Sequence, residues 1–376
     1  MSSGLVTSRR NRRTPYTECV ESLGVSGFSI VNHTLLPKSF ARSVEEDYWH
    51  LKEHVQLWDV GCQRQVELRG PDAALLAQKM TPRDLSAMTP GQCYYTPVID
   101  NHAGLLNDPV LLKRASDWFW FSIADSDLLL WAKALALGMN LDVEVREPDV
   151  WPLAVQGPRA EDLVARVFGD GVRSVRYFSF LECDFHSRQL VVARSGYSKQ
   201  GGYEIYLDDS PLGITLWDTL WEAGADLQVA PGCPNLIERI EAGLLSYGNE
   251  MTRENNPLEI NLDRFCHLER EIDYIGRSAL EAIAAQGPSQ RMRGLLIDGT
   301  PCPPCGKPWP VLVGDIKVGQ VTSAIWSPAF RQNVGLSLID KDHWNPGTPV
   351  TVLLPDGHEL GAVITSLPFT VSSSTP

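Results

Sequence analysis

The sequence predicts an α+β protein, with helices and strands mixed over residues 1–287 and a small antiparallel β-barrel domain over residues 288–376. Two observations predict this division. In the first part, short apolar strands run into Gly-Pro or Ser-Pro turns that open helical patterns, and proline suits the first turn of a helix. After Gln286-Gly287-Pro288 the pattern changes to short β-branched runs separated by turn residues. A length of 376 residues also exceeds the ~250–300 residues at which one hydrophobic core stops growing.

The first part contains a strand–turn–helix unit that occurs twice. Residues 66–69 are typical of a strand that runs into Gly70-Pro71, and residues 153–156 are typical of a strand that runs into Gly157-Pro158. A helical pattern follows each turn. This similarity indicates an internal duplication, although strands that end in Gly-Pro before a helix are common enough to arise independently.

The remaining elements follow from periodicity. Alternating or apolar runs predict strands at residues 117–123, 141–145, 190–194 and 203–207. Helical spacing predicts helices at residues 126–138, from Ser210-Pro211 onward, and at 235–247 with Gly248 as the C-terminal cap. The barrel strands are expected at residues 293–297, 311–313, 317–322, 334–339, 350–354 and 362–365.

Composition narrows the classes of function. A hydrophobic content of 43% indicates a globular chain, and a net charge of −13 gives no general attraction to nucleic acid or to an anionic membrane surface. No apolar stretch approaches the ~20 residues needed to span a bilayer. Eight scattered cysteines favour a reducing compartment, and no apolar core follows the four arginines at positions 9–13, so we expect a cytoplasmic protein with a basic N-terminal arm. The oligomeric state is left open, a homo-oligomer included.

Few short motifs indicate chemistry. Dinucleotide, Walker and Gly-x-Ser-x-Gly patterns are absent, and the His-x-x-Glu-His run at residues 50–54 shows no third zinc ligand, so no metal is expected. Two polar stretches are more informative. Asp108 lies at a break between apolar strands, where it is either a turn residue or a functional acid. Glu204 lies between Tyr203 and Ile205 on a strand after a glycine-rich turn, and it either binds the paired N–H donors of a flat heterocycle or faces solvent.

These two stretches, in this order, resemble the aminomethyltransferase (glycine-cleavage T protein) family. Residues 104–109 are similar to the family's Gly-Gly-apolar-apolar-Asp-Asp turn, and residues 196–205 to its Gly-Tyr-Thr-Gly-Glu-x-Gly-Phe-Glu-Ile run. Residues 240–250 and 319–328 resemble two further family runs. Within the family, the runs at residues 50–56, 92–95 and 231–235 are similar to the branch that demethylates dimethylsulfoniopropionate.

The resemblance implies a three-lobed folate-binding fold that ends in the β-barrel domain, with tetrahydrofolate as the methyl acceptor. Glu204 maps to the glutamate that pairs with the pterin ring, and Asp108 maps to the catalytic aspartate near the reactive nitrogen of the folate. Tyr95, Tyr206 and Arg239 correspond to further cofactor-binding positions, together with Asp108 itself. The resemblance also explains the His-x-x-Glu-His run without a metal.

The implied activity is methyl transfer from a small onium donor, by resemblance dimethylsulfoniopropionate, to tetrahydrofolate, which yields 5-methyltetrahydrofolate. An onium methyl group accepts no strong hydrogen bond, so aromatic faces are expected around it, and Tyr197, Trp151 and Tyr203 are the candidate substrate-binding residues. Tyr197 stands where the branch carries tryptophan, Val31 where it carries tyrosine, and Trp151 where it carries a small residue. The identity of the donor is therefore open, and the alternatives are a folate-dependent demethylase of a methylated amine or methoxy compound and a non-catalytic folate-binding protein.

Overall fold

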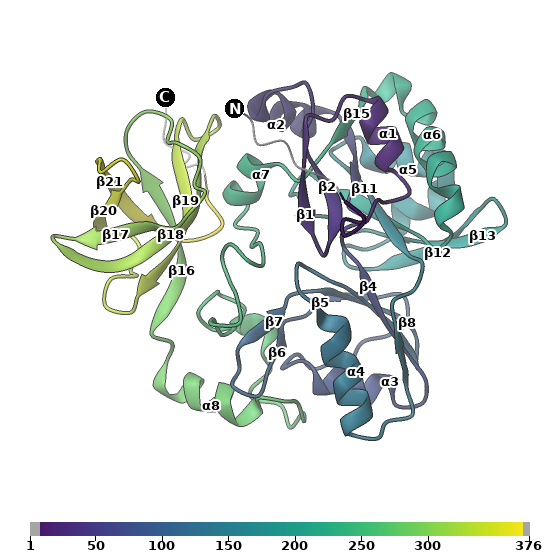
Figure 1. Cartoon of the computed structure of the whole chain (residues 1–376), viewed down its shortest axis with the longest axis horizontal. Helices are drawn as coiled ribbons and strands as arrows, with labels where there is room; N and C mark the ends of the chain where they lie inside the picture. Colours follow the sequence, from purple (N-terminus) through teal and green to yellow (C-terminus); the bar gives the residue numbers. More distant parts are fainter. Residues whose placement is uncertain (1–7, 371–376) are drawn as a thin grey trace. The chain divides into compact units, whose positions relative to one another are not determined.

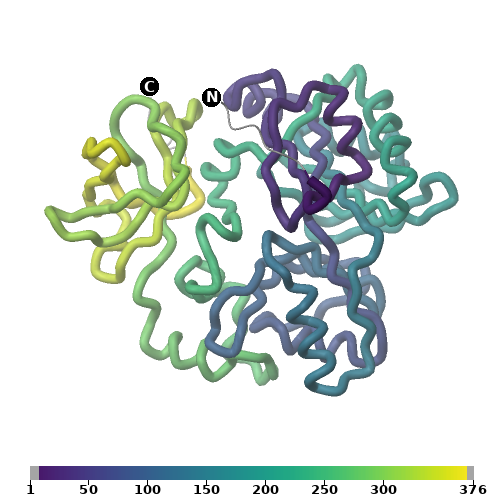
Figure 2. Tube along the Cα trace, in the orientation of Figure 1, coloured from purple at the N-terminus to yellow at the C-terminus, as the bar shows by residue number. Residues whose placement is uncertain are grey.

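The computed structural model describes residues 8–370, which form two compact units (Figures 1 and 2). Of these residues, the first unit contains 8–80, 84–96 and 107–235. The second contains 81–83, 97–106 and 236–370. The predicted domain boundary at residue 287 lies inside the second unit and stays a prediction.

A six-stranded sheet forms the centre of the first unit, with the strand order β12-β13-β14-β11-β3-β15. Its pairs are antiparallel except for β3 and β15, which run parallel. The strands are β3 (Val55–Asp59), β11 (Trp151–Gln156), β12 (Phe180–Phe185), β13 (Arg188–Ala193), β14 (Gly202–Leu207) and β15 (Val229–Gly232). Three helices cover one face of this sheet in a single apolar core: α1 (Thr17–Ser22), α5 (Ala160–Phe168) and α6 (Gly213–Ala223).

A five-stranded antiparallel sheet lies against the other face, with the order β10-β4-β9-β8-β5. Its strands are β4 (Gln65–Arg69), β5 (Cys93–Tyr95), β8 (Val110–Ala115), β9 (Trp118–Ser122) and β10 (Glu144–Arg146), and α3 (Ala73–Lys79) and α4 (Leu128–Gly138) pack against them. The two sheets meet where Cys93, Leu112 and Trp120 contact Ala193 and Tyr206. The first unit is completed by the hairpin β1 (Gly27–Val31) and β2 (Thr34–Ser39) and by α2 (Val44–Glu53).

The two predicted strand–turn–helix units are confirmed as β4–α3 and β11–α5. The residue after each strand is a glycine with positive φ, +140° at Gly70 and +120° at Gly157. A Cβ atom at Gly70 would lie 2.7 Å from the backbone oxygen of Asp142, and one at Gly157 would lie 2.3 Å from that of His54. Both positions therefore require glycine, because any side chain would overlap a neighbouring backbone.

The second unit contains the predicted barrel. Six antiparallel strands close in the order β16-β19-β18-β17-β20-β21 around an apolar core, which confirms the C-terminal domain type. These strands are β16 (Gln290–Ile297), β17 (Trp309–Val313), β18 (Ile316–Ser327), β19 (Gln332–Asp340), β20 (Pro349–Leu353) and β21 (Glu359–Thr365). The remaining elements are α7 (Leu236–Glu241), α8 (Arg277–Gln286) and the short pair β6 (Val98–Ile99) and β7 (Leu105–Asn107).

The predicted helix at residues 235–247 was wrong in length, because α7 ends at Glu241. Gly243 takes a positive φ of +66°, and the chain then folds back so that the N–H group of Leu244 donates to the Arg239 backbone oxygen. The Arg239 side chain holds this reversal by donating to the Leu244 backbone oxygen at 3.0 Å and to Glu250 at 2.7 Å. The helix therefore ends in a left-handed glycine cap, and the buried ion pair stabilises the reversal that follows it. Likewise, the strand expected at residues 141–145 starts only at Glu144.

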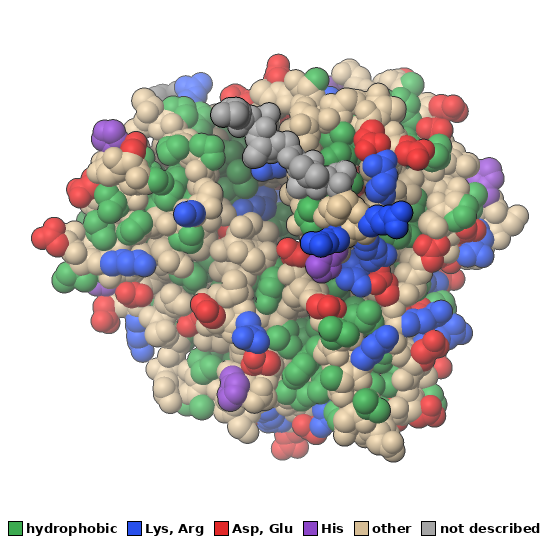
Figure 3. Space-filling view, in the orientation of Figure 1, with side chains coloured by type: hydrophobic (Ala, Val, Ile, Leu, Met, Phe, Trp, Pro, Cys, Tyr) green, Lys and Arg blue, Asp and Glu red, His purple; other side chains and the backbone are tan. Residues whose placement is uncertain are grey.

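The surface of this net-negative protein carries acidic and basic side chains close to one another. On the face that Figure 3 shows, basic side chains lie among acidic ones. Between residues 8 and 370, no helix is both long and apolar enough to cross a membrane.

Candidate functional site

Glu204 is a buried carboxylate at the centre of the six-stranded sheet. It lies on β14 opposite Ala193 on one neighbouring strand and Ala154 on the other, and 4% of its surface is exposed. The Ser195 hydroxyl donates to one of its carboxylate oxygens at 2.5 Å. Burial raises the pKa of Glu204, and the hydroxyls of Ser195 and Tyr206 oppose that rise. The helices cover the other face of the sheet, so Glu204 points toward the five-stranded sheet.

Tyr206 lies two residues further along β14 and therefore on the same face as Glu204. Its side chain is completely buried against Cys93 and Trp120. Its hydroxyl makes no hydrogen bond of ordinary geometry within residues 8–370, and the same is true of the buried amide oxygen of Gln65 on β4. The Tyr206 hydroxyl lies beside Glu204 and Ser122, and both buried atoms keep capacity for a further hydrogen bond between the sheets.

Asp108 follows directly after β7, and the Tyr95 hydroxyl donates to its carboxylate at 2.7 Å. The neighbouring Asn107 is buried and fixes this turn, because its amide exchanges hydrogen bonds of 3.0 and 3.1 Å with the backbone of Ala124. The cross-strand register places Tyr95 in one row with Val110, Ser122 and Gln65. This row shares its side of the five-stranded sheet with Trp120, which contacts Tyr206. The register thus places Tyr95, with Asp108 hydrogen-bonded to it, on the side of the five-stranded sheet that faces Glu204 and Tyr206.

Tyr197 lies in the glycine-rich turn between β13 and β14 and packs against a cluster that contains Trp58. Register places Trp58 on the same face as Glu204, with Ala154 between them. Trp58 is completely buried, and its indole N–H donates to the Gln56 side chain at 2.8 Å. Nothing in the local sequence marks Trp58 as a site residue, because strand alternation alone does not say which strand pairs with β14.

The other two candidate substrate residues lie on the opposite, helix-covered face. The Tyr203 hydroxyl donates to the Val172 backbone oxygen at 3.1 Å within the core. The Trp151 ring lies under the guanidinium of Arg12, 5.0 Å from its centroid, and the indole N–H donates to Asp149 at 2.6 Å. Substrate binding by Trp151 and Tyr203 stays a prediction, and the structure does not bring them together with Glu204.

Arg239 belongs to the second unit, where it is buried on α7. Its guanidinium pairs with Glu250 and also donates to the Ser323 hydroxyl at 2.8 Å. Its positive charge is therefore already balanced by a buried carboxylate. Cofactor binding by Arg239 stays a prediction.

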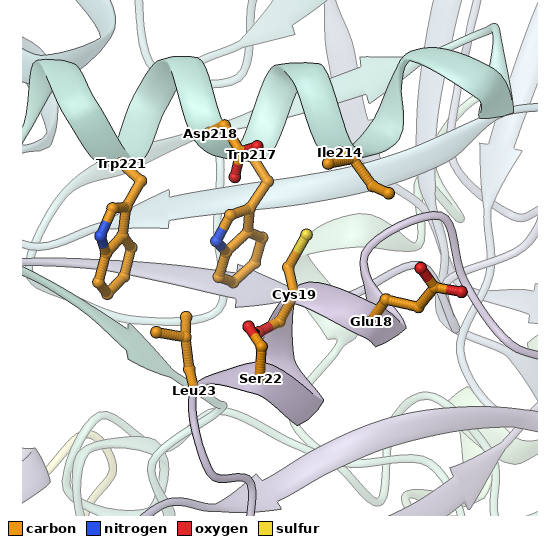
Figure 4. Close-up of a pocket in the computed structure, with 8 residues that line it drawn as sticks. All are labelled: Glu18, Cys19, Ser22, Leu23, Ile214, Trp217, Asp218 and Trp221. Atoms are coloured by element: carbon orange, nitrogen blue, oxygen red, sulfur yellow. The ribbon is translucent and has the colours of Figure 1, made fainter.

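A separate groove of about 370 Å³ lies between α1 and α6 (Figure 4). Figure 4 shows Trp217 and Trp221 side by side along α6, facing the residues of α1. None of the residues predicted for the site lines this groove, which is on the side of the sheet opposite Glu204. Within residues 8–370, no group of three or more histidine, cysteine, aspartate or glutamate side chains is placed to hold a metal ion.

Two family models match this chain. The GCVT N-terminal domain matches residues 17–270, and the glycine cleavage T-protein C-terminal barrel domain matches residues 290–370. The chain belongs to the glycine cleavage T-protein family. This membership confirms the predicted family and its α+β fold with a C-terminal antiparallel barrel.

Among relatives of this T-protein family member, dimethylsulfoniopropionate demethylase DmdA from Ruegeria pomeroyi is 53% identical over 94% of this chain and 96% of the relative. The aminomethyltransferase from Bacillus subtilis is 30% identical over 84% of this chain and 88% of the relative. The crystal structure of aminomethyltransferase T from Bartonella henselae, at 23% identity, superposes with a TM-score of 0.86 and covers 96% of this chain and 98% of the other, which shows a shared fold.

Proposed function

We propose that this T-protein family member is a tetrahydrofolate-dependent demethylase that transfers a methyl group from dimethylsulfoniopropionate to tetrahydrofolate. The products are 5-methyltetrahydrofolate and the thioether that remains on the donor. The observation that carries the proposal is the 53% identity, over nearly the whole chain, to a dimethylsulfoniopropionate demethylase.

The residues between the two sheets fit a reduced folate. A pterin presents neighbouring N–H donors in one plane, and the buried Glu204 carboxylate is an acceptor with capacity beyond its hydrogen bond from Ser195. The hydroxyl of Tyr206, which has no partner of ordinary geometry within residues 8–370, can donate or accept beside it. These two groups support the proposed pterin site.

Methyl transfer from a sulfonium needs little covalent assistance from the protein. The sulfonium carbon is already electrophilic, and bound tetrahydrofolate supplies the nitrogen that receives the methyl group. The protein must hold the two substrates in line and exclude water. Asp108 is proposed to take up the proton that the folate nitrogen loses, and the hydrogen bond from Tyr95 holds its carboxylate in one orientation.

Aromatic faces are proposed to hold the sulfonium cation. Tyr197 lies in a cluster with Trp58, on the side of the sheet that carries Glu204. A cation over an aromatic face gains roughly 0.5–2 kcal/mol, more when water is excluded. This placement supports Tyr197 as a donor-binding residue.

The decisive experiment supplies dimethylsulfoniopropionate with deuterated S-methyl groups together with tetrahydrofolate. Mass spectrometry should find the intact labelled methyl group on the folate and one thioether molecule for each methyl group transferred. Glycine betaine and a methoxy compound serve as competing donors in parallel reactions. Transfer only from one of these donors would replace the proposed substrate, and folate binding without any transfer would indicate a non-catalytic folate-binding protein.

A further inference from the structure

Gln156 ends β11 and is completely buried beneath the glycine-rich turn of residues 196–202. Its amide nitrogen donates to the backbone oxygens of Ser195 at 3.2 Å and of Tyr203 at 3.4 Å, one on each stem of the turn. Its amide oxygen accepts from the Ser198 hydroxyl at 2.8 Å, within the turn. One side chain therefore binds both stems and the middle of the same turn.

Two glycines of the turn leave the space that this amide occupies. Gly196 has φ +153° and Gly202 has φ +145°, a range that other residues rarely adopt. A Cβ atom at Gly196 would lie 2.1 Å from the Gln156 amide nitrogen, and one at Gly202 would lie 2.5 Å from it. The space that a side chain would need at either position is thus occupied by Gln156.

Ser195 connects the hydrogen bonds of Gln156 to Glu204, the proposed pterin-binding carboxylate. The backbone oxygen of Ser195 accepts from Gln156, and the hydroxyl of Ser195 donates to Glu204. Gln156 also lies opposite Gly202, two residues before Glu204 on β14. A change at Gln156 removes the hydrogen bond that holds Ser195. It also removes the hydrogen bond to Tyr203, the neighbour of Glu204 on β14.

We propose that Gln156 is a positioning residue that orients Glu204 through Ser195 and holds the turn carrying Tyr197 through Ser198. The hydrogen bonds of Gln156 go to the turn and its stems, so it acts on Glu204 indirectly. Its importance for folate binding rests on the proposed function, whereas its effect on Glu204 does not.

The test measures the titration of the Glu204 carboxyl by carbon-13 NMR in a double-mutant cycle of Ser195→Ala and Gln156→Met. The Ser195 hydroxyl lowers the pKa of Glu204, so Ser195→Ala should raise it by roughly one unit, the equivalent of one charge-assisted hydrogen bond. Gln156→Met keeps the length of the side chain and removes its amide. It should raise the pKa of Glu204 in the same direction, and it should add nothing once Ser195 is alanine.

Gln56→Met is the matched control. Gln56 is equally buried and lies directly opposite Gln156 in the sheet, but its amide contacts Asp47 and Trp58 and not the turn. This variant should lose stability and leave the Glu204 titration unchanged. If Gln156→Met does not fold, Gln156→Asn, which keeps the amide but draws it back by one methylene, replaces it and should give the same upward shift.

An unchanged Glu204 pKa in the Gln156 variant, or an effect fully additive with that of Ser195→Ala, would overturn the inference. Tetrahydrofolate affinity is measured separately and should fall severalfold in the Gln156 variant. Because the titration uses no folate, failure of the wild-type protein to bind tetrahydrofolate would overturn the proposed function and leave the positioning role standing.

Discussion

Replacing Glu204 with glutamine should change ligand binding and stability in opposite directions. A carboxylate that accepts hydrogen bonds from the pterin contributes about 1.5–3 kcal/mol through its charge, so Glu204→Gln should raise the dissociation constant for tetrahydrofolate roughly 10- to 150-fold. The stability of the protein without ligand should instead favour the uncharged glutamine at position 204. Burial raises the pKa of Glu204, so ionised Glu204 is less stable in the native state than in the unfolded chain. Above the ordinary pKa of glutamate, the variant should therefore have an equal or higher free energy of unfolding.

Calorimetry with tetrahydrofolate under anaerobic conditions measures the first quantity, and urea unfolding at about pH 8 measures the second. Glu67→Gln is the matched control. Glu67 is equally buried, but Trp118, Trp120 and Arg146 all donate to it, and together these contacts outweigh burial and lower its pKa. Its ionised form is thus stabilised by folding, so Glu67→Gln should lower the free energy of unfolding and leave folate affinity unchanged.

Wild-type folate affinity in a folded Glu204→Gln protein would refute the assignment of Glu204 to the pterin. A large loss of stability in that variant would instead make Glu204 a structural residue like Glu67. A structural carboxylate has all its hydrogen-bond partners inside the protein, whereas a ligand-binding carboxylate keeps acceptor sites available for the ligand.

Three further predictions follow from the site and its surroundings. Asp108→Asn should keep tetrahydrofolate binding and slow methyl transfer in single-turnover experiments, because the amide keeps the shape but not the basicity; wild-type rates would make Asp108 a turn residue. Tyr197→Trp should raise kcat/KM for dimethylsulfoniopropionate relative to a neutral methoxy donor, and an unchanged ratio of the two would remove Tyr197 from the cation site. Burial raises the pKa of Asp59 to about 7, so the native state holds its proton more tightly than the unfolded chain, and Asp59 should contribute a fall of up to about 4 kcal/mol in the free energy of unfolding as pH rises from about 4 to 7. Asp59→Asn should remove that contribution, so the difference in unfolding free energy between variant and wild type should change by that amount between about pH 4 and 7 in urea unfolding, and a difference that does not change with pH would contradict the shifted pKa.

Local signals predicted much of the fold because they depend on neighbours in the chain. The Gly-Pro turns at Gly70 and Gly157 predicted two strand–helix units, and both glycines meet a neighbouring backbone that excludes any side chain. The change after residue 287 to short β-branched runs separated by turn residues predicted the antiparallel barrel. The end of α7 was predicted wrongly: the helix stops at Glu241 because Gly243, and not Gly248, takes the left-handed conformation of its cap.

The sequence by itself determined the family, the mixed helices and strands of the first part, the barrel of the last part and the acidic residues worth testing. Motifs and periodicity carry these conclusions, and both are properties of neighbouring positions. Only the tertiary structure decided which of those residues meet. The alternation of side chains along a strand shows which residues share a face, but not what that face packs against. Only the pairing of the strands places Tyr203 and Trp151 in the helix-covered core and Glu204 and Tyr206 between the sheets. Pairing also brought Trp58 and Gln156, neither prominent in the sequence, to the face that carries Glu204. A binding site is a set of long-range contacts, and their geometry exists only once the strands have found their partners.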